Sequence, residues 1–179
     1  RNEKLKLFHA TKNIHIINTD DENSKYFWNI PAKQKIGYSI KDAKNAEFNL
    51  NLIGDFNILN ALAAISVAKA YGIDFQISKK ALEKAKGIAG RMEIVAKNPT
   101  IIVDYAHTPE QLEAVYKTFK TQPLICVLGS CGGGRDKWKR PVLGKIAGQY
   151  CKKIIITNED PYDENPFSIM EEIEKGFSQ

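Results

Sequence analysis

Residues 124–141 read LICVLGSCGGGRDKWKRP, and this stretch decides the fold. Leu124–Leu128 is a continuous apolar run between Pro123 and Gly129, which is typical of a strand buried on both faces. The glycines that follow predict a loop, because they allow backbone conformations that other residues resist and let the main chain approach a ligand. The loop also concentrates positive charge, on Arg135, Lys137, Lys139 and Arg140. We therefore expect a strand that leads into a site for an anionic or carboxylate-bearing ligand.

The segments around this stretch alternate between strand and helix patterns. Strands are predicted at 101–103, 124–128 and 153–156, and helices at 110–120, at 142–150 and from Pro166 onward. Thr108 is the expected cap of the helix at 110–120, with Pro109 in its first turn. Such alternation predicts an α/β fold with a parallel sheet, in which ligands bind at the carboxyl ends of the strands. Asp104, the glycine-rich loop and Asp160 all fall at such ends.

The first half of the chain has a mixed pattern. Residues 1–8 indicate the end of a helix, 14–17 a buried strand and 22–29 a short helix. Strands at 35–38 and 47–53 are expected to be antiparallel and half-exposed. A helix should begin with Asp55 as its cap, end at Gly72 and carry an apolar stripe of Phe56, Leu59, Ala63, Val67 and Ala70; a further helix should be capped by Ser78. We place a domain boundary at Asn98-Pro99, which divides the chain into 1–97 and 98–179.

Composition indicates a soluble globular protein, with 43% hydrophobic and 26% charged residues. The net charge of +5 is compatible with nucleic-acid binding, but the lysines are scattered among acidic residues and no aromatic-rich RNA-binding segment is present. No apolar stretch approaches the length of a membrane span. The three cysteines form no CxxC pair and are expected to be reduced thiols in a cytoplasmic protein. Cys126 is expected in the core, whereas Cys131 in the loop is either inert or reactive.

The glycine-rich loop does not match the known phosphate-binding motifs. Gly129 and Gly134 have the GxxxxG spacing of a P-loop, but Arg135-Asp136 follows where Lys and then Ser or Thr are needed. The order of the glycines also fails GxGxxG. The three histidines, His9, His15 and His107, are too dispersed for a local zinc motif, and no metal site is predicted within the chain.

Two asparagines provide a separate candidate site. Asn57 and Asn60 lie three residues apart in the first turns of the predicted helix, so their side chains share one face near its N-terminus. There they can receive a polar ligand together with the free backbone N–H groups. Local capping of the helix is the alternative, and the sequence does not decide between the two.

Four segments taken together resemble one family. They are GDFNILNALAAISVA at 54–68, GRMEIV at 90–95, DYAHTP at 104–109 and GSCGGGRDKWKRP at 129–141. Their order and spacing resemble the Mur ligases, in particular the UDP-N-acetylmuramoyl-tripeptide synthetase branch, over essentially the whole chain. That family uses ATP to join an amino acid to a nucleotide-linked muramoyl dipeptide through an acyl-phosphate. The resemblance implies that 1–97 is the back part of a central ATP-binding domain and that 98–179 is an incomplete Rossmann-like C-terminal domain.

The resemblance also implies roles for single residues. Asn57 and Asn60 would lie near the adenine, Arg91 would face the phosphates of ATP, Asp104 would hold the ribose, and His107 would lie near the nucleotide. Arg135 would bind the carboxylate of the incoming amino acid, a task suited to a bidentate guanidinium. Lys139 belongs to the same motif as Arg135 and is grouped with the substrate-binding residues.

The chain departs from the family pattern after its third predicted strand in this domain. Family members that add meso-diaminopimelate carry DNPR there, whereas this chain has Glu159-Asp160-Pro161-Tyr162. The missing arginine removes the expected clamp for a second carboxylate. Asp160, as a buried or half-buried anion, would prefer a cationic partner. We therefore expect Asp160 and Tyr162 to favour a lysine-like amino acid, with a turn or capping role for Asp160 as the alternative.

The family's UDP-binding domain, P-loop and magnesium ligands are expected before Arg1, and the end of the C-terminal domain after Gln179. The chain is then part of a longer cytoplasmic, monomeric ligase and is inactive alone. ATP and Mg²⁺ are the implied cofactors; a UDP-muramoyl dipeptide and a free amino acid are the implied partners, with no nucleic acid and no membrane. The alternatives are another Mur or folylpolyglutamate-type ligase, and a non-catalytic nucleotide-binding module.

Overall fold

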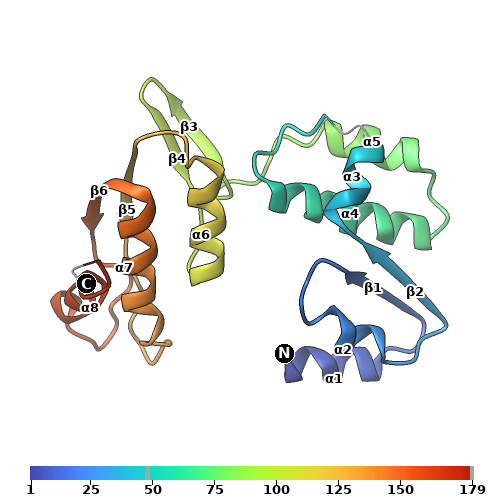
Figure 1. The fold of residues 1–179 in the computed structure, drawn as a ribbon, viewed down its shortest axis with the longest axis horizontal. Coiled ribbons are helices and arrows are strands. Elements are labelled where there is room, and N and C mark those ends of the chain that lie inside the picture. The colour runs from blue at the N-terminus through green and yellow to red at the C-terminus, as the bar shows by residue number, and fades with distance from the viewer. Residues whose placement is uncertain (47–48, 178–179) are drawn as a thin grey trace. The chain divides into compact units, whose positions relative to one another are not determined.

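The computed structural model describes residues 1–46 and 49–177 of the chain. Its internal contacts divide the chain into two compact units, Arg1–Ile88 and Ala89–Gln179 (Figure 1). The sequence-based boundary at Asn98-Pro99 falls within the second unit, in the turn of a hairpin. None of the helices in the described part of the chain is long and apolar enough to cross a membrane.

The described part of the second unit, residues 89–177, contains three helices and two pairs of strands. Their bounds are β3 Glu93–Lys97, β4 Thr100–Val103, α6 Pro109–Thr118, β5 Leu124–Leu128, α7 Lys139–Tyr150, β6 Cys151–Ile156 and α8 Pro166–Glu174. The expected strand-helix alternation is confirmed from β4 to α8, and β5 pairs in parallel with β6. The chain therefore has the mixed α/β architecture with parallel strands that its sequence predicts. The expectation that the strand at 101–103 belongs to the parallel sheet is corrected: among the described residues β4 pairs with β3, antiparallel, because the turn at 98–99 folds the two runs into a hairpin.

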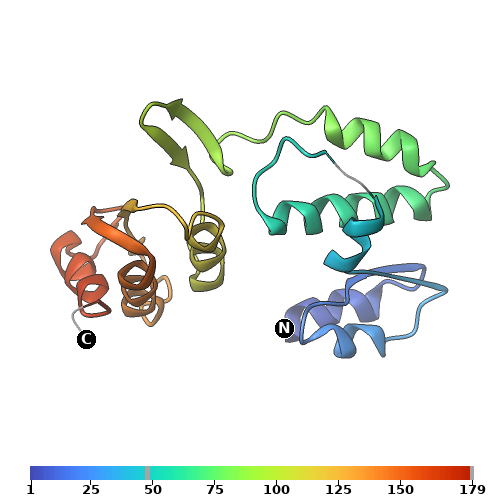
Figure 2. The ribbon, with the colours of Figure 1, turned by 45° about the horizontal axis from the view of Figure 1, so that its top comes forward.

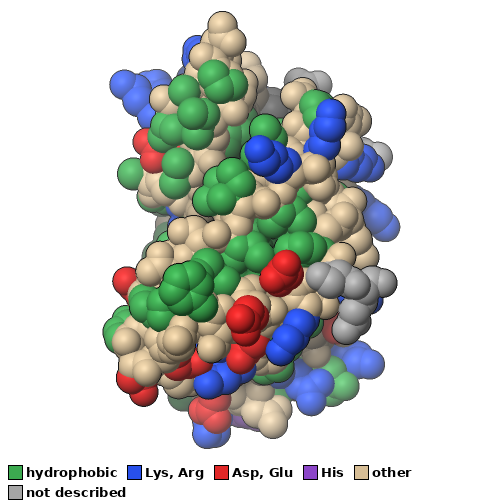
Figure 3. Space-filling model, turned by 90° about the vertical axis from the view of Figure 1, so that its left-hand side faces the viewer, with side chains coloured by type: hydrophobic (Ala, Val, Ile, Leu, Met, Phe, Trp, Pro, Cys, Tyr) green, Lys and Arg blue, Asp and Glu red, His purple; other side chains and the backbone are tan. Residues whose placement is uncertain are grey.

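The core of this unit lies between the β5–β6 pair and its helices. Helix α7 lies between α6 and α8, which both contact it (Figures 1 and 2). In β5 the side chains of Cys126 and Leu128 are buried, but Ile125 and Val127 are 67% and 65% exposed. The expectation of a strand buried on both faces is thus wrong for the described residues, because their helices cover one face. Hydrophobic side chains consequently reach the surface of the molecule (Figure 3).

Two of the three cysteines are bonded to each other. Cys126 of β5 and Cys151 of β6 form a disulfide, with 6.1 Å between their Cα atoms. The expectation of three reduced thiols is corrected here: the two residues stand on adjacent strands, a proximity that a separation of 25 residues along the chain does not reveal. The placement of Cys126 in the core is confirmed. Cys131 is a free thiol.

In its described residues, 1–46 and 49–88, the first unit combines one parallel pair of strands with five helices. Its elements are α1 Asn2–Ala10, β1 Ile14–Asn18, α2 Ser24–Trp28, β2 Gln34–Tyr38, α3 Ile40–Ala46, α4 Asp55–Ala70 and α5 Phe75–Glu83. Strand β2 pairs in parallel with β1, with Ile16 opposite Ile36, and the antiparallel expectation for it is wrong. The reason is the connection: α2 carries the chain across, as a parallel pair requires. Helix α4 contacts both strands.

The segment that precedes α4 also differs from its prediction. Glu47 and Phe48 of the predicted strand at 47–53 lie outside the described residues, and 49–53 form no strand. Gly54, with φ of 98°, caps α4 without a side-chain hydrogen bond, and Asp55 is its first helical residue. The expected role of Asp55 as cap is therefore corrected.

Helices α4 and α5 correct two further details. The buried residues of α4 are Ala61, Leu62 and Ser66, whereas Val67 of the predicted stripe is 45% exposed. The cap of α5 is Asp74, whose carboxylate accepts a hydrogen bond from Gln76 N at 2.8 Å. Ser78 is the expected cap but lies inside α5, where its hydroxyl donates to the Asp74 carbonyl.

Candidate functional site

Two loops meet at the carboxyl ends of the parallel strands of the second unit. The first, here the glycine loop, comprises residues 129–138 between β5 and α7; the second, the β6–α8 loop, comprises 157–165. Thr157 N donates to Leu128 O at 3.0 Å, and Gly132 N donates to Asp160 O at 3.1 Å. Because the strands are parallel neighbours, the loops that carry Arg135 and Asp160 adjoin each other.

Two glycines of the first loop, Gly132 and Gly133, are required by this close approach. A Cβ atom on Gly132 would overlap the carbonyl oxygen of Pro161. Gly133 has φ of +64°, and a Cβ atom there would lie 2.8 Å from the ring of Tyr162. The sequence predicts a close approach of the main chain to a ligand here. The partner in the structure is the β6–α8 loop.

A buried arginine holds the two loops together. Arg140, at the start of α7, is 0% exposed. Its Nη1 and Nη2 atoms donate to both carboxylate oxygens of Glu164, at 3.0 and 3.1 Å, and Nη2 also donates to Cys131 O at 3.1 Å. Glu172 of α8 accepts a further bond from Nη1 at 2.8 Å. Lys137 lies 2.8 Å from Glu164.

The charges in this cluster stabilise one another. Hydrogen bonds from Arg140 and then from Lys137 lower the pKa of Glu164 from 4.5 to about 2. The same contact with Glu164 raises the pKa of Arg140. A carboxylate that pairs with a buried guanidinium in a two-bond fork stays ionised at any ordinary pH. The cluster was not predicted, because neither glutamate carries a recognisable local signal.

The residues expected to bind the amino acid lie on the surface of the two loops. Arg135 is exposed, and among the described residues its guanidinium has no hydrogen bond or ion pair. Tyr162 is 69% exposed, and both it and Asp160 have positive φ angles, of 53° and 36°. Asp160 is itself exposed, which corrects the expectation of a buried or half-buried carboxylate.

Asp104 forms the centre of a second group of candidate residues. One carboxylate oxygen accepts a hydrogen bond from Met92 N at 2.8 Å, and the other accepts from Ala106 N at 2.7 Å. The residue thus ties the end of β4 to the start of β3. Each oxygen retains a lone pair, so the carboxylate can still accept a hydrogen bond from a ligand.

An exposed tyrosine lies beside Asp104. The guanidinium of Arg91 lies 4.5 Å from the centre of the Tyr105 ring, and the ring of His107 meets it edge-on at 4.9 Å. Tyr105 is 58% exposed, although aromatic rings are usually covered. It was not singled out from the sequence, although the DYAHTP motif contains it. The structure therefore groups Arg91, Asp104 and His107 around Tyr105.

His107 connects this group to α7. Its Nδ1 atom donates to Tyr105 O at 3.0 Å, since a carbonyl can only accept. Lys139 Nζ donates to the carbonyl of His107 at 3.1 Å. Lys139 was grouped with Arg135 from the sequence, but its ammonium contacts the segment that carries His107.

Asn57 and Asn60 belong to the first unit, whereas all other candidate residues belong to the second. Asn57 donates from its side-chain amide to Ile53 O at 2.7 Å, and Asn60 donates to Asn57 Oδ1 at 3.4 Å. These are local contacts around the start of α4, as the capping alternative expects.

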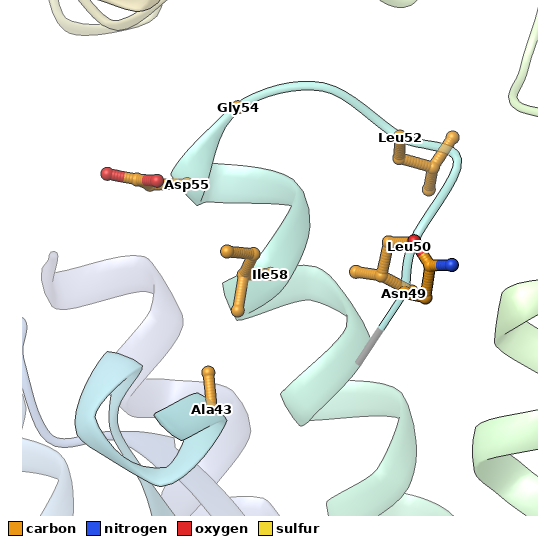
Figure 4. A pocket seen from close by; sticks show the side chains of 7 residues that line it. All are labelled: Ala43, Asn49, Leu50, Leu52, Gly54, Asp55 and Ile58. Carbon is orange, nitrogen blue, oxygen red and sulfur yellow. The ribbon is translucent and has the colours of Figure 1, made fainter. Parts of the chain in front are cut away.

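A pocket of about 250 Å³ opens at the start of α4. The side chains of Leu50 and Ile58 point toward each other across it, and that of Asp55 points away (Figure 4). Ala43, Asn49, Leu52 and Gly54 complete its lining. Asn57 and Asn60 do not line this pocket.

The side chains of Arg91, Asp104 and Tyr105 are better suited to bind a nucleotide than a metal ion. A carboxylate with lone pairs to spare, an exposed aromatic ring and a guanidinium suit a ribose, a base and a phosphate group respectively. Within residues 1–46 and 49–177, by contrast, no three His, Cys, Asp or Glu side chains form a cluster that could hold a metal.

Known proteins are similar to this chain in sequence and in fold. Residues 90–179 match the model of the family described as Mur ligase, glutamate ligase domain. A 2,6-diaminopimelate ligase of UDP-N-acetylmuramoyl-L-alanyl-D-glutamate from Halalkalibacterium halodurans is 36% identical over 91% of this chain and 39% of its own length. A UDP-N-acetylmuramyl-tripeptide synthetase from a Roseiflexus species is 46% identical over 73% of this chain and 26% of its own length.

A solved structure agrees with these relatives. It is also a UDP-N-acetylmuramoyl-L-alanyl-D-glutamate–2,6-diaminopimelate ligase, with 29% identity and a TM-score of 0.51 over 97% of this chain and 42% of its own. The chain spans about two-fifths of the length of the Halalkalibacterium relative, or 39%. With half of its residues matched by the family model, and with relatives and a solved structure that agree, this chain belongs to the Mur ligase family.

Proposed function

We propose that the protein is an ATP-dependent ligase that adds an amino acid to UDP-N-acetylmuramoyl-L-alanyl-D-glutamate in peptidoglycan synthesis, through an acyl-phosphate. The observation that carries this proposal is the pair of adjoining loops in a member of this family. One loop carries Arg135, whose guanidinium has no partner among the described residues, and the other carries Asp160 and Tyr162. The names of the relatives support the same reaction. The amino acid would bind at the carboxyl ends of the parallel strands β5 and β6, where open α/β sheets bind ligands. ATP would bind beside Asp104, at the end of β4.

On the nucleotide side, we propose that Arg91, Asp104 and His107 bind ATP. Asp104 would accept a hydrogen bond from a ribose hydroxyl, because its two backbone contacts fix it and leave lone pairs free. Asn57 and Asn60 would contact the adenine from residues 1–97, as part of the central ATP-binding domain, with 98–179 as the C-terminal domain. Mg²⁺ would bind with ATP through residues outside this chain. ATP would supply the phosphoryl group that activates a carboxylate of the terminal D-glutamate, and the amino group of the incoming amino acid would then displace the phosphate.

On the amino-acid side, Arg135 would bind the α-carboxylate with its guanidinium fork. We propose that Asp160 and Tyr162 direct the enzyme to L-lysine, because Asp160 offers an anion to the side-chain ammonium and no arginine stands there for a second carboxylate. Lys139 would support the motif through His107. The relatives named as diaminopimelate ligases make meso-diaminopimelate the competing substrate.

The test compares the two amino acids as substrates. Full-length enzyme is assayed with ATP and the UDP-muramoyl dipeptide, and L-lysine should be used with the higher kcat/KM. The double variant Asp160→Asn, Tyr162→Arg should shift the preference toward meso-diaminopimelate, since it restores the arginine and removes the anion. A wild-type enzyme that prefers diaminopimelate would refute the lysine assignment, and one that adds neither would refute the ligase function.

A second variant tests the role of Arg135. Arg135→Ala should raise the KM for the amino acid by about tenfold or more, since a charge-assisted bidentate contact contributes at least about 1.4 kcal/mol. The KM for ATP should stay within about twofold. Lys120→Ala removes an exposed cation outside both loops and is the matched control. Equal effects on ATP and amino acid would contradict the assignment.

We also propose that the enzyme acts as a cytoplasmic monomer, and that these 179 residues do not ligate by themselves, because their sequence holds no P-loop to position the γ-phosphate. Ligation by the 179-residue chain with ATP would disprove the second statement.

A further inference from the structure

We infer that Arg140 is a positioning residue for amino-acid recognition: it holds the glycine loop against the β6–α8 loop and so sets where Arg135 stands relative to Asp160 and Tyr162. This inference rests on the proposed function, which places the amino acid between those residues. Arg140 itself touches no substrate, because its side chain is fully buried.

The contacts of Arg140 reach both loops at once. Its Nη2 atom donates to Cys131 O, four residues before Arg135, and to Glu164, two residues after Tyr162. The bond from Gly132 N to Asp160 O lies between these two points. One rigid guanidinium plane therefore connects the backbone of one substrate loop to a side chain of the other. Movement of either loop breaks at least one of these bonds.

The packing of α7 alone does not explain why a charged cluster is buried at this position. A buried charge that only filled space would be costly, and a well-packed apolar side chain would often serve as well or better. Here the ion has two carboxylate partners, and its Nε atom is left without a partner among the described residues. Arg140 thus makes two hydrogen bonds to Glu164 and one to the Cys131 carbonyl in the loop, although its Nε–H group is left without an acceptor among the described residues. Such an arrangement fixes one orientation of the loops, as supporting residues around a binding site do.

The two glutamates provide a matched pair of variants. Both pair with the same Nη1 atom of Arg140. Glu164 belongs to the loop that carries Asp160 and Tyr162, whereas Glu172 belongs to α8. Glu164→Gln and Glu172→Gln each remove one negative charge next to Arg140 and keep the shape of the side chain. Both should reduce stability, but only the first loosens the connection between the loops.

Arg140→Lys tests the arginine itself. A lysine keeps the charge but has no planar fork, so it cannot bind both oxygens of Glu164 and the Cys131 carbonyl together. We expect Arg140→Lys and Glu164→Gln to raise the KM for the amino acid by about tenfold to a hundredfold, since small misplacements of binding groups have effects of this order. The KM for ATP and for the UDP-muramoyl dipeptide should change less than about twofold, and Glu172→Gln should leave all three within that range.

Hydrogen–deuterium exchange of the same full-length variants is the second measurement, and it needs no substrate. The amides of 129–135 should exchange faster in Arg140→Lys and Glu164→Gln than in the wild type or in Glu172→Gln. Unchanged exchange, an unchanged KM for the amino acid, or equal increases in the KM for ATP would each overturn the inference. A wild type that adds no amino acid would instead refute the proposed function, and the exchange rates would then show whether Arg140 orders the loops.

Discussion

The contact between Gly132 and Pro161 allows a quantitative prediction for Gly132→Ala. The new methyl group would overlap the carbonyl oxygen of Pro161 and would also come within 3.2 Å of Glu164 Oε1. The two loops must then separate, which costs about 1–3 kcal/mol as overpacking. Separation also breaks the bond from Gly132 N to Asp160 O, and a lost hydrogen bond costs about 1 kcal/mol. We expect Gly132→Ala to lower the free energy of unfolding by about 2–4 kcal/mol.

Gly134→Ala is the control for this variant. Gly134 has φ of +75°, and no atom lies within 4 Å of the position of its Cβ. The substitution therefore brings only the strain of a left-handed backbone, about 1–2 kcal/mol. Comparing the two variants separates the contact between the loops from the general cost of placing alanine at a loop glycine.

Urea unfolding of the chain, followed by tryptophan fluorescence, measures both variants. Trp138 stands at the end of the glycine loop, and Trp28 is the other tryptophan, so a Trp28→Phe background makes the signal specific. Gly132→Ala should be less stable than Gly134→Ala by about 1.5 kcal/mol, which is the difference between the centres of the two expected ranges. Equal stability of the two variants would show that the loops do not meet as described.

Three further predictions concern the same unit. Gly144→Ala would place a methyl group on the carbonyl oxygen of Ile173 where α7 crosses α8, so the melting temperature should fall by several degrees, about 1–3 kcal/mol; an unchanged value would contradict this crossing. Ionised Glu164 stabilises the fold above its unfolded pKa near 4.5, and this contribution is lost as the pH falls toward about 2, so the difference in unfolding free energy between wild type and Glu164→Gln should shrink over that range in acid titrations. One thiol, Cys131, should react with a thiol reagent before reduction, and three thiols should react after reduction and unfolding. The reaction of Cys131 should be slow, because burial raises the pKa of its thiol. Three fast-reacting thiols without reductant would exclude the disulfide.

The sequence predicted those features that depend on neighbouring residues. Helix α6 begins as expected, because Thr108 and Pro109 are both local start signals and Thr108 Oγ1 accepts from Gln111 N at 3.4 Å. The glycine-rich loop and the grouping of Asp104 with His107 also follow from short motifs. The prediction that Asp55 caps α4 was wrong, because Gly54 occupies the capping position and Asp55 is the first residue of the helix.

Features that depend on distant partners were missed or misjudged. The parallel pairing of β1 with β2 depends on a crossover, which alternation of side chains alone cannot distinguish from a hairpin. Glu164 stands 24 residues after Arg140, and nothing near it in the sequence indicates that it will reach a buried guanidinium. The exposure of Ile125 likewise depends on which faces the helices cover. These facts are set by the packing of elements and not by any one of them.

The anchoring of the β6–α8 loop at Glu164 has a consequence for how specificity can change. Glu159, Asp160 and Tyr162 are exposed, whereas Glu164, only two residues after Tyr162, is paired with Arg140 and Lys137. The β6–α8 loop thus has two parts: residues 159–162, where other side chains can be accommodated, and Glu164, which is held in place by its ion pairs. Libraries randomised at 159–162 with Glu164 retained should yield folded enzymes at high frequency, so that new amino-acid preferences can arise without loss of the scaffold.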